Sequence, residues 1–187
     1  MAFLYSRLTN ADCSGVLALQ EKNLVDNLDV ESRRDGFLSA RFSWEQLQQM
    51  DQDVAVLVAR DADRVAGYLC ASGVELNRQY PLLGAMIDVY DRLCFEGHTL
   101  AEQKTFVYGP ACVDSDFRGR GILRGLFRAL LSEIEDRFEA GVAFVAEDNP
   151  RSLGAHVAGL GMQDIGHFEF KNKRYRILAF AAASQST

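Results

Sequence analysis

The sequence lacks the cysteine pattern of a zinc site or a disulfide framework. Its four cysteines, Cys13, Cys70, Cys94 and Cys112, are scattered, with no C-x-x-C pair and no clustered histidines. We therefore expect reduced thiols packed in or near the core, and no bound metal ion.

Long apolar runs and an excess of basic charge are also missing. No apolar run reaches the roughly 18–20 residues that a membrane span needs, and residues 1–7 lack a basic leader followed by a long apolar stretch. The 26 acidic and 20 basic side chains give a net charge of −6. This balance argues against a general partner of nucleic acids or membrane surfaces. We expect a cytoplasmic protein whose residues 1–187 form a single domain.

The first half of the chain predicts helices followed by a β-hairpin. Thr9 to Asp12 supply helix-capping side chains, and Ser43 followed by Gln46 resembles a capping box. The predicted elements are a strand at 3–8, a helix ending near 24, a short helix at 44–50, and paired strands at 54–59 and 64–72. Residues 76–104 are the least legible part, and we expect an irregular or helical excursion over one face of the domain.

The second half shows clearer periodicity. Apolar residues from Ile122 to Phe138 recur with the spacing of a long amphipathic helix. Pro110 would have to lie at a bulge or an unpaired edge of its strand, and Asn149 followed by Pro150 is typical of a helix start. The predicted elements are a strand at 106–113, a turn at 114–121, the helix at 122–138, a strand at 142–146, a helix from 149 to about 159, and strands at 168–170 and 175–180.

The turn before the long helix contains the sequence Arg118-Gly119-Arg120-Gly121, with Arg124 and Arg128 following it. The first N–H groups of a helix have no partner within the helix, and glycine lets a bulky anion approach them. Arginines at the rim add bidentate contacts to phosphate oxygens. Taken alone the motif also fits a tight turn beside solvated arginines.

Spacing beyond the turn agrees with the first interpretation. Arg118, Gly121, the preceding Val113 and the later Asn149 resemble the fingerprint of the GNAT N-acetyltransferase superfamily, and Gly161-Met162 fits the end of the following helix. The resemblance covers residues 104–180. Within the superfamily, the sequence is similar to small predicted bacterial acetyltransferases. It implies an α/β fold with a mixed, mostly antiparallel sheet of six or seven strands, helices on both faces and two splayed central strands.

The same resemblance implies acetyl-coenzyme A as the cofactor. Backbone groups around Val113 would pair with its pantetheine arm, and amides of the turn would hold its pyrophosphate. The implied cofactor-binding residues are Cys112, Val113, Arg118, Gly119, Arg120, Gly121, Ile122, Leu123, Arg124, Asn149 and Ser152.

Two positions depart from the family pattern. Leu123 replaces the final Gly or Ala of the fingerprint, and Val157 replaces a tyrosine that protonates the departing thiolate in many members. The acid must therefore come from elsewhere or be dispensable, and a base must still remove the proton of the amine. Tyr108, Glu147 and His156 are the candidates, each with an ordinary structural role as the alternative.

Three functions remain open at this stage. The first is transfer of an acetyl group to a primary amine of a small molecule, such as an amino acid or a polyamine. The second is acetylation of a protein N-terminus or lysine, and the third is a non-catalytic acyl-CoA sensor. A homodimer is a further expectation, because many members of the superfamily pair through sheet edges.

Overall fold

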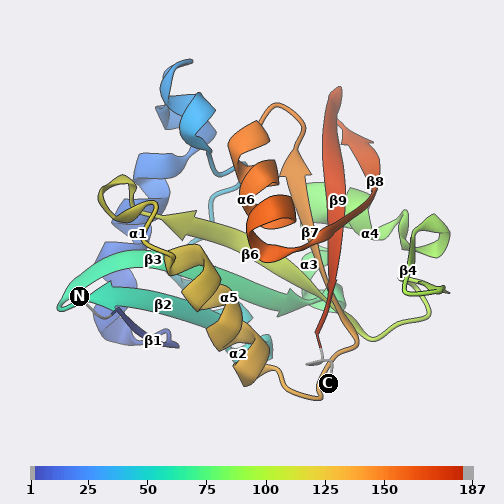
Figure 1. The fold of residues 1–187 in the computed structure, drawn as a ribbon, viewed down its shortest axis with the longest axis horizontal. Helices are drawn as coiled ribbons and strands as arrows, with labels where there is room; N and C mark the ends of the chain where they lie inside the picture. Colours follow the sequence, from blue (N-terminus) through green and yellow to red (C-terminus); the bar gives the residue numbers. More distant parts are fainter. Residues whose placement is uncertain (1–2, 183–187) are drawn as a thin grey trace.

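The computed structural model describes residues 3–182, except for the side chains of residues 34 and 35. Its centre is a seven-stranded sheet in the order β1-β2-β3-β6-β7-β9-β8 (Figure 1). Every neighbouring pair is antiparallel except β6 and β7, which are parallel. The bounds are β1 Leu4–Arg7, β2 Ala55–Asp61, β3 Arg64–Gly73, β6 Thr105–Val113, β7 Ala140–Ala146, β8 Gln163–Phe170 and β9 Lys173–Ala181. The predicted fold class is confirmed.

Helices cover both faces of this sheet. In Figure 1, α5 and α6 lie in front of the strands, while α1, α2 and α4 lie behind them. The bounds are α1 Cys13–Asn23, α2 Trp44–Asp53, α3 Val74–Asn77, α4 Pro81–Ile87, α5 Ile122–Glu133 and α6 Pro150–Leu160. The excursion at residues 76–104 is helical, as expected, and ends in a small hairpin of β4 (Cys94–Phe95) and β5 (His98–Thr99).

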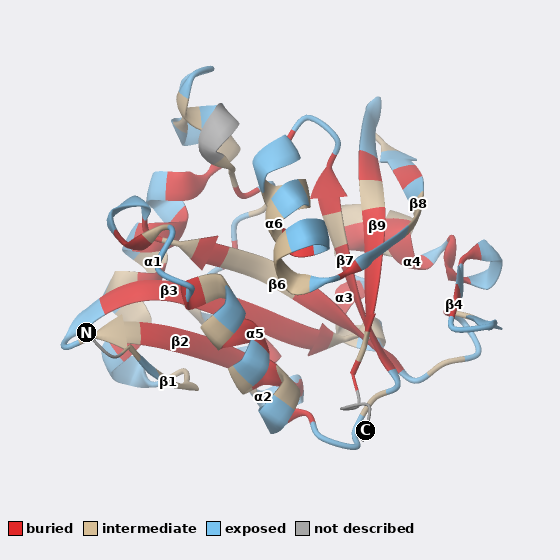
Figure 2. Cartoon of the chain, in the orientation of Figure 1, coloured by how far each residue is buried: buried red, intermediate tan, exposed pale blue. Residues whose placement is uncertain are grey.

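Burial of both sheet faces explains why β2 and β3 read as continuous apolar runs (Figure 2). The front face packs against the apolar stripe of α5, where Leu126 and Leu130 are fully buried against the cluster that contains Leu57 and Leu69. Truncating either leucine to alanine would cost about 2–5 kcal/mol of stability. α5 is therefore fixed firmly on the sheet, and its N-terminus is fixed with it.

Two predicted boundaries were wrong. α5 ends at Glu133 rather than near Phe138, because Ile134 leaves the helical region (φ −101°, ψ 8°) and Asp136 has a φ of 58°. Ile134 and Phe138 still pack on the core after the chain turns. β8 begins at Gln163 rather than at residue 168, since most of its side chains are exposed at the sheet edge and leave little apolar alternation to recognise.

The parallel pair positions the site. β6 and β7 are paired only from Thr105 to Val107 on β6, after which the two strands diverge. The register of β6 against β3 shifts between Leu69 and Ala71, so of the two predicted positions for Pro110, a bulge or an unpaired edge, the structure shows the bulge. The result is a gap between β6 and β7 that opens toward their carboxyl ends. No helix within residues 3–182 is long and apolar enough to cross a membrane.

Candidate functional site

Unpaired main chain of β6 forms one wall of the gap. The N–H of Asp114 donates to the carbonyl of Ala66 on β3, at 3.0 Å. Peptide groups alternate sides along a strand, so those of Val113 and Ala111 point the other way, toward the side that β7 has left. This edge presents donors and acceptors to a ligand within the domain.

The turn between β6 and α5 has the geometry of an anion site. Gly119 and Gly121 have φ values of 76° and 78°, which only glycine adopts without strain, and a Cβ at either position would meet nothing within 4 Å. The first hydrogen bond of α5 runs from the Gly125 N–H to the Gly121 carbonyl at 2.9 Å. The amides of Ile122 to Arg124 therefore precede the helical ladder, at the positive end of the helix.

An ion-pair network ties this turn to β3 and α1. Asp114 accepts hydrogen bonds from the Asp116 amide at 3.0 Å and from Arg64 at 2.9 Å, and Lys22 lies 3.4 Å away. Burial works against ionisation of Asp114, but these partners lower its pKa overall. Arg64 also donates to the Asp116 carboxylate at 2.5 Å, so the carboxylates of Asp114 and Asp116 together brace the turn.

The arginines of the motif have different surroundings. Arg118 lines the gap and donates to Asn23 of α1 at 3.2 Å. Arg120 lies over the Phe117 ring, 5.6 Å from its centroid, and Arg124 donates to the Gly159 carbonyl at the end of α6. Arg118 is thus the one of these three placed directly on the cavity described next, while Arg124 joins α5 to α6.

Two cavities meet in the gap. The first, of about 240 Å³, runs along the turn and is lined by Val113, Gly119, Gly121 and Leu123 among others. The second, of about 160 Å³, lies deeper between β6, β7 and the helical excursion. Both are lined by Phe37, Leu38, Ala111, Ser152 and His156.

Tyr108 and His156 form a hydrogen-bonded pair where the cavities meet. The Tyr108 hydroxyl lies 3.2 Å from His156 Nε2, and His156 Nδ1 lies 2.7 Å from the Ser152 carbonyl. Since a carbonyl only accepts, we assign the ring proton to Nδ1, which leaves Nε2 to accept from the tyrosine. Burial lowers the pKa of His156, against the opposing effect of the Ser152 hydrogen bond, and burial raises the pKa of Tyr108. Both side chains are therefore neutral near pH 7.

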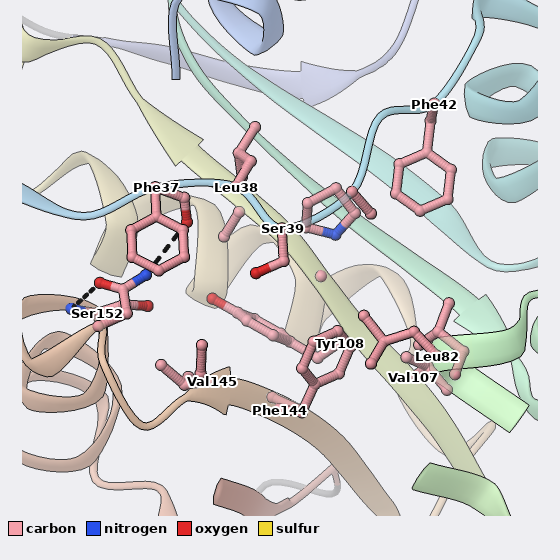
Figure 3. Close-up of a pocket in the computed structure, with 18 of the residues that line it drawn as sticks. Phe37, Leu38, Ser39, Phe42, Leu82, Val107, Tyr108, Phe144, Val145 and Ser152 are labelled. Carbon is pink, nitrogen blue, oxygen red and sulfur yellow. Dashed lines mark hydrogen bonds between the residues drawn. The ribbon is translucent and has the colours of Figure 1, made fainter. Parts of the chain in front are cut away.

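Asn149 links the two sides of the site. It is the N-cap of α6, as predicted, and its Oδ1 accepts from the Ser152 amide at 3.3 Å. Its Nδ2 donates to the Phe37 carbonyl at 3.2 Å, the contact drawn as the dashed line that ends at Phe37 in Figure 3. One buried amide thus holds α6 and the segment at residues 36–42 together.

Three predicted site residues line neither cavity: Arg120, Arg124 and Glu147. A fourth, Cys112, lines the first cavity but directs its thiol elsewhere. Glu147 is exposed, lies 3.8 Å from Arg176 of β9, and lines neither of the two cavities. The Cys112 thiol packs toward α1, 4.0 Å from the Leu19 carbonyl, and burial raises its pKa to about 12. Only the main chain of Cys112 is available to the first cavity. The base role of Glu147 stays a prediction without a contact in this geometry.

The wall of the second cavity was not predicted from the sequence. It includes Phe37, Phe42, Leu82 and Phe144, which are drawn around Tyr108 in Figure 3, and also Tyr80. They come from a segment without regular periodicity, from the start of α4 and from β7. The clustering of aromatics near residues 37–42 and 80 was the available signal.

Comparisons with known proteins agree on the architecture. No model of a known protein family matches the sequence. No curated protein matches it either. Among solved structures, the chain is similar to an N-acetyltransferase from Staphylococcus aureus Mu50, with a TM-score of 0.62, 15% identity, and coverage of 97% of this chain and 99% of that one.

Two further structures show the same likeness over their whole length. The ribosomal-protein-S18-alanine N-acetyltransferase of Escherichia coli gives a TM-score of 0.61 at 11% identity, covering 100% of this chain and 99% of that one. The yncA protein of Salmonella typhimurium, whose structure holds its cofactor acetyl-CoA, gives 0.60 at 15% identity, covering 100% and 98%. The chain has the GNAT N-acetyltransferase fold, as its sequence resemblance predicted.

Proposed function

We propose that this protein is an acetyl-CoA-dependent N-acetyltransferase that acetylates a primary amine of a small molecule. The observation that carries the proposal is the continuity of the two cavities, with the Tyr108–His156 pair where they meet. One cavity has the features of a phosphate-bearing cofactor site, and the other is enclosed enough to position a small acceptor. The similar N-acetyltransferase structures, one of them with acetyl-CoA bound, support the same interpretation.

The residues of the first cavity fit the cofactor. The amides of Gly121 to Leu123 would hold the pyrophosphate at the N-terminus of α5, and Arg118 would add positive charge at the rim. The unpaired main chain of Ala111 and Val113 would pair with the amides of the pantetheine arm. Leu123 is compatible with this role, because its main chain supplies the contact while its side chain is only half-buried.

When bound, acetyl-CoA supplies an activated acetyl thioester and a thiol leaving group. An amine N–H adjacent to Tyr108 would transfer its proton to the phenol oxygen as the phenol proton moves to His156 Nε2. The resulting imidazolium is held by its Nδ1–H bond to the Ser152 carbonyl. Reversal of these two transfers delivers the proton to the departing sulfur. One proton is taken and one is returned, so the pair ends in its starting state.

A main-chain N–H beside Val113 would stabilise the charge that develops on the thioester oxygen. Tyr108 would take the place of the tyrosine that the family carries at the position of Val157. The hydroxyl would then reach the reacting atoms from β6 instead of from α6.

A small acceptor fits a partly open cavity of about 160 Å³ better than a protein chain does. Action in the cytoplasm follows from the need for acetyl-CoA and is compatible with the free cysteines of the described chain. Homodimer formation stays a prediction, which size-exclusion chromatography with light scattering would test.

Calorimetric titration with acetyl-CoA, followed by an assay of thiol release over a panel of amines and peptides, tests the proposal. Micromolar binding together with release on small amines would support it. Release on peptides alone would replace it with the protein acetyltransferase. Binding without any release would favour a sensor, and absence of binding would refute the cofactor assignment.

A further inference from the structure

The second cavity has an unusual charge content for a site that receives an amine. None of the described residues that line it is Asp, Glu or Lys. Its one ionised side chain, Arg41, is mostly exposed and directs its guanidinium to Glu21 of α1, at 2.9 Å. A polycationic acceptor would find no carboxylate among these lining residues. Its charges would be buried without a partner, which is costly.

The walls are instead aromatic and fixed in place. Phe42 and Tyr80 contact each other edge to face at 5.6 Å, and the Tyr80 hydroxyl accepts from Gln46 at 3.2 Å. On the opposite side, Phe144 packs edge to face on Tyr175, with centroids 5.5 Å apart. These contacts hold the cavity open and apolar (Figure 3).

The cavity is partly open, and its volume indicates the size of the group that its apolar walls can surround. An apolar cavity of about 150 Å³ binds benzene in another protein, and this one measures about 160 Å³. It therefore accommodates one ring or a branched aliphatic group, with the amine directed to Tyr108.

Proton removal limits the acceptor further. The only titratable groups lining the cavity besides Arg41 are Tyr80, Tyr108 and His156 among the described residues. Burial favours the neutral form of His156, so this pair is a weak base. An alkyl amine with a pKa of about 10.4 is almost entirely protonated at about pH 8, whereas an α-amine with a pKa of about 7.7–8.0 is at least half neutral.

From these observations we infer that the acceptor is a weakly basic primary amine on an apolar body of about one ring, not a polyamine or a lysine side chain. This inference rests on the proposed acetyltransferase function and specifies its substrate class. Two sources share the chemistry: aromatic amines, and the α-amino group of an apolar aminoacyl compound.

The test compares thiol release from acetyl-CoA with five acceptors at about pH 8. p-Toluidine represents the aromatic amines and L-phenylalaninamide represents the α-amines. Phenethylamine keeps the ring but is strongly basic, while spermidine and Nα-acetyl-lysine are strongly basic without a ring. We expect kcat/KM for the better of the first two to exceed that for spermidine by about 100-fold, the ratio of their neutral fractions. The ranking of the first two identifies the source.

A charge variant supplies an independent test. Ser39 is exposed and lines the cavity. In Figure 3 its hydroxyl points toward the side chain of Tyr108. Ser39→Asp should raise kcat/KM for spermidine by about tenfold and lower it for p-toluidine. Ser14→Asp, an equally exposed change on α1 that lines neither cavity, should change neither value.

Acetyl-CoA binding, measured separately by calorimetry, distinguishes failure of this inference from failure of the proposed function. Bound acetyl-CoA with spermidine or Nα-acetyl-lysine as the best acceptor overturns this inference and leaves the acetyltransferase proposal intact. Bound acetyl-CoA with no acceptor consumed overturns it as well. No binding of acetyl-CoA removes the proposed function itself.

Discussion

The two cavities that meet at β6 are built from different parts of the chain. In the first cavity, which we propose for the cofactor, the proposed contacts come mostly from main chain: the turn with Gly119 and Gly121, the first amides of α5 and the free edge of β6. The acceptor cavity consists of side chains from the segment at residues 36–42, α4, β6 and β7. A main-chain site depends on glycines at fixed spacing, whereas a side-chain site can change its ligand by substitution without loss of the fold. The comparison predicts that variants in each cavity affect one substrate and that variants at the junction affect the chemical step.

The junction should show the largest effect. Tyr108→Phe removes the hydroxyl that joins the reacting amine to His156, and we expect kcat to fall by about 100-fold or more. The affinity for acetyl-CoA, measured by calorimetry, should stay within about twofold. Tyr68→Phe is the matched control, because the Tyr68 hydroxyl is also buried but has no hydrogen-bond partner in the described structure. Equal activity of the two variants would exclude Tyr108 from the proton path.

A change in the turn should affect the cofactor alone. Gly121→Asp adds a carboxylate at the N-terminus of α5 and strains a residue with a φ of 78°. We expect the Kd for acetyl-CoA to rise by about 30-fold or more. Gly161→Asp adds the same charge at a φ of 76°, outside both cavities. Both variants should lose about 1–3 kcal/mol of stability, so a similar loss of affinity in both would trace the effect to unfolding.

The pH dependence of stability reports on the junction. Burial lowers the pKa of His156 below its ordinary value of about 6.5. The stabilisation from the neutral, buried imidazole is fully present above about pH 6.5 and is lost as the pH falls through the lower pKa of the folded state. Urea unfolding at a series of pH values should therefore show the wild type losing stability relative to His156→Gln below about pH 6.5. Parallel curves would contradict the assignment of a neutral His156.

The smallest effect is expected at the Asn149 link between α6 and the segment at residues 36–42. Asn149→Asp keeps an oxygen to cap α6 but replaces the donor that holds the Phe37 carbonyl. We expect a loss of about 1 kcal/mol in unfolding free energy and a rise of a few-fold in KM for the amine. Asn149→Ala, which also loses the helix cap, should cost about 1 kcal/mol more. If Asn149→Asp leaves the KM for the amine unchanged, the link does not position the acceptor wall.

The cofactor side was largely predictable because its residues are contiguous. A strand, a turn that needs positive φ and an amphipathic helix follow one another between residues 105 and 133, and each has its own sequence signal. Asn149 was predictable as a helix cap because Pro150 follows it. Even so, the separate roles of Arg118, Arg120 and Arg124 depend on Asn23, Phe117 and Gly159, whose proximity only the fold creates.

The acceptor side could be predicted only in fragments. Tyr108 and His156 were each recognised as candidates, but they lie 48 residues apart and only the divergence of β6 from β7 brings them together. Glu147 was a reasonable candidate from its place after β7, yet the strand directs it toward Arg176. The segment at residues 36–42 has neither helical nor strand periodicity, so the clustering of its rings was a signal of composition only and did not show which residues share a wall.

The wall shared by the two cavities implies thermodynamic linkage between the substrates. Phe37 and Leu38 line both cavities, and Asn149 ties this segment to the helix that flanks the cofactor. A ligand that orders the segment from one side reduces the ordering cost for a ligand on the other side. By reciprocity, acetyl-CoA and the amine would each change the affinity for the other by the same factor. The free energy of binding both substrates together would then be more favourable than the sum of the two separate binding free energies.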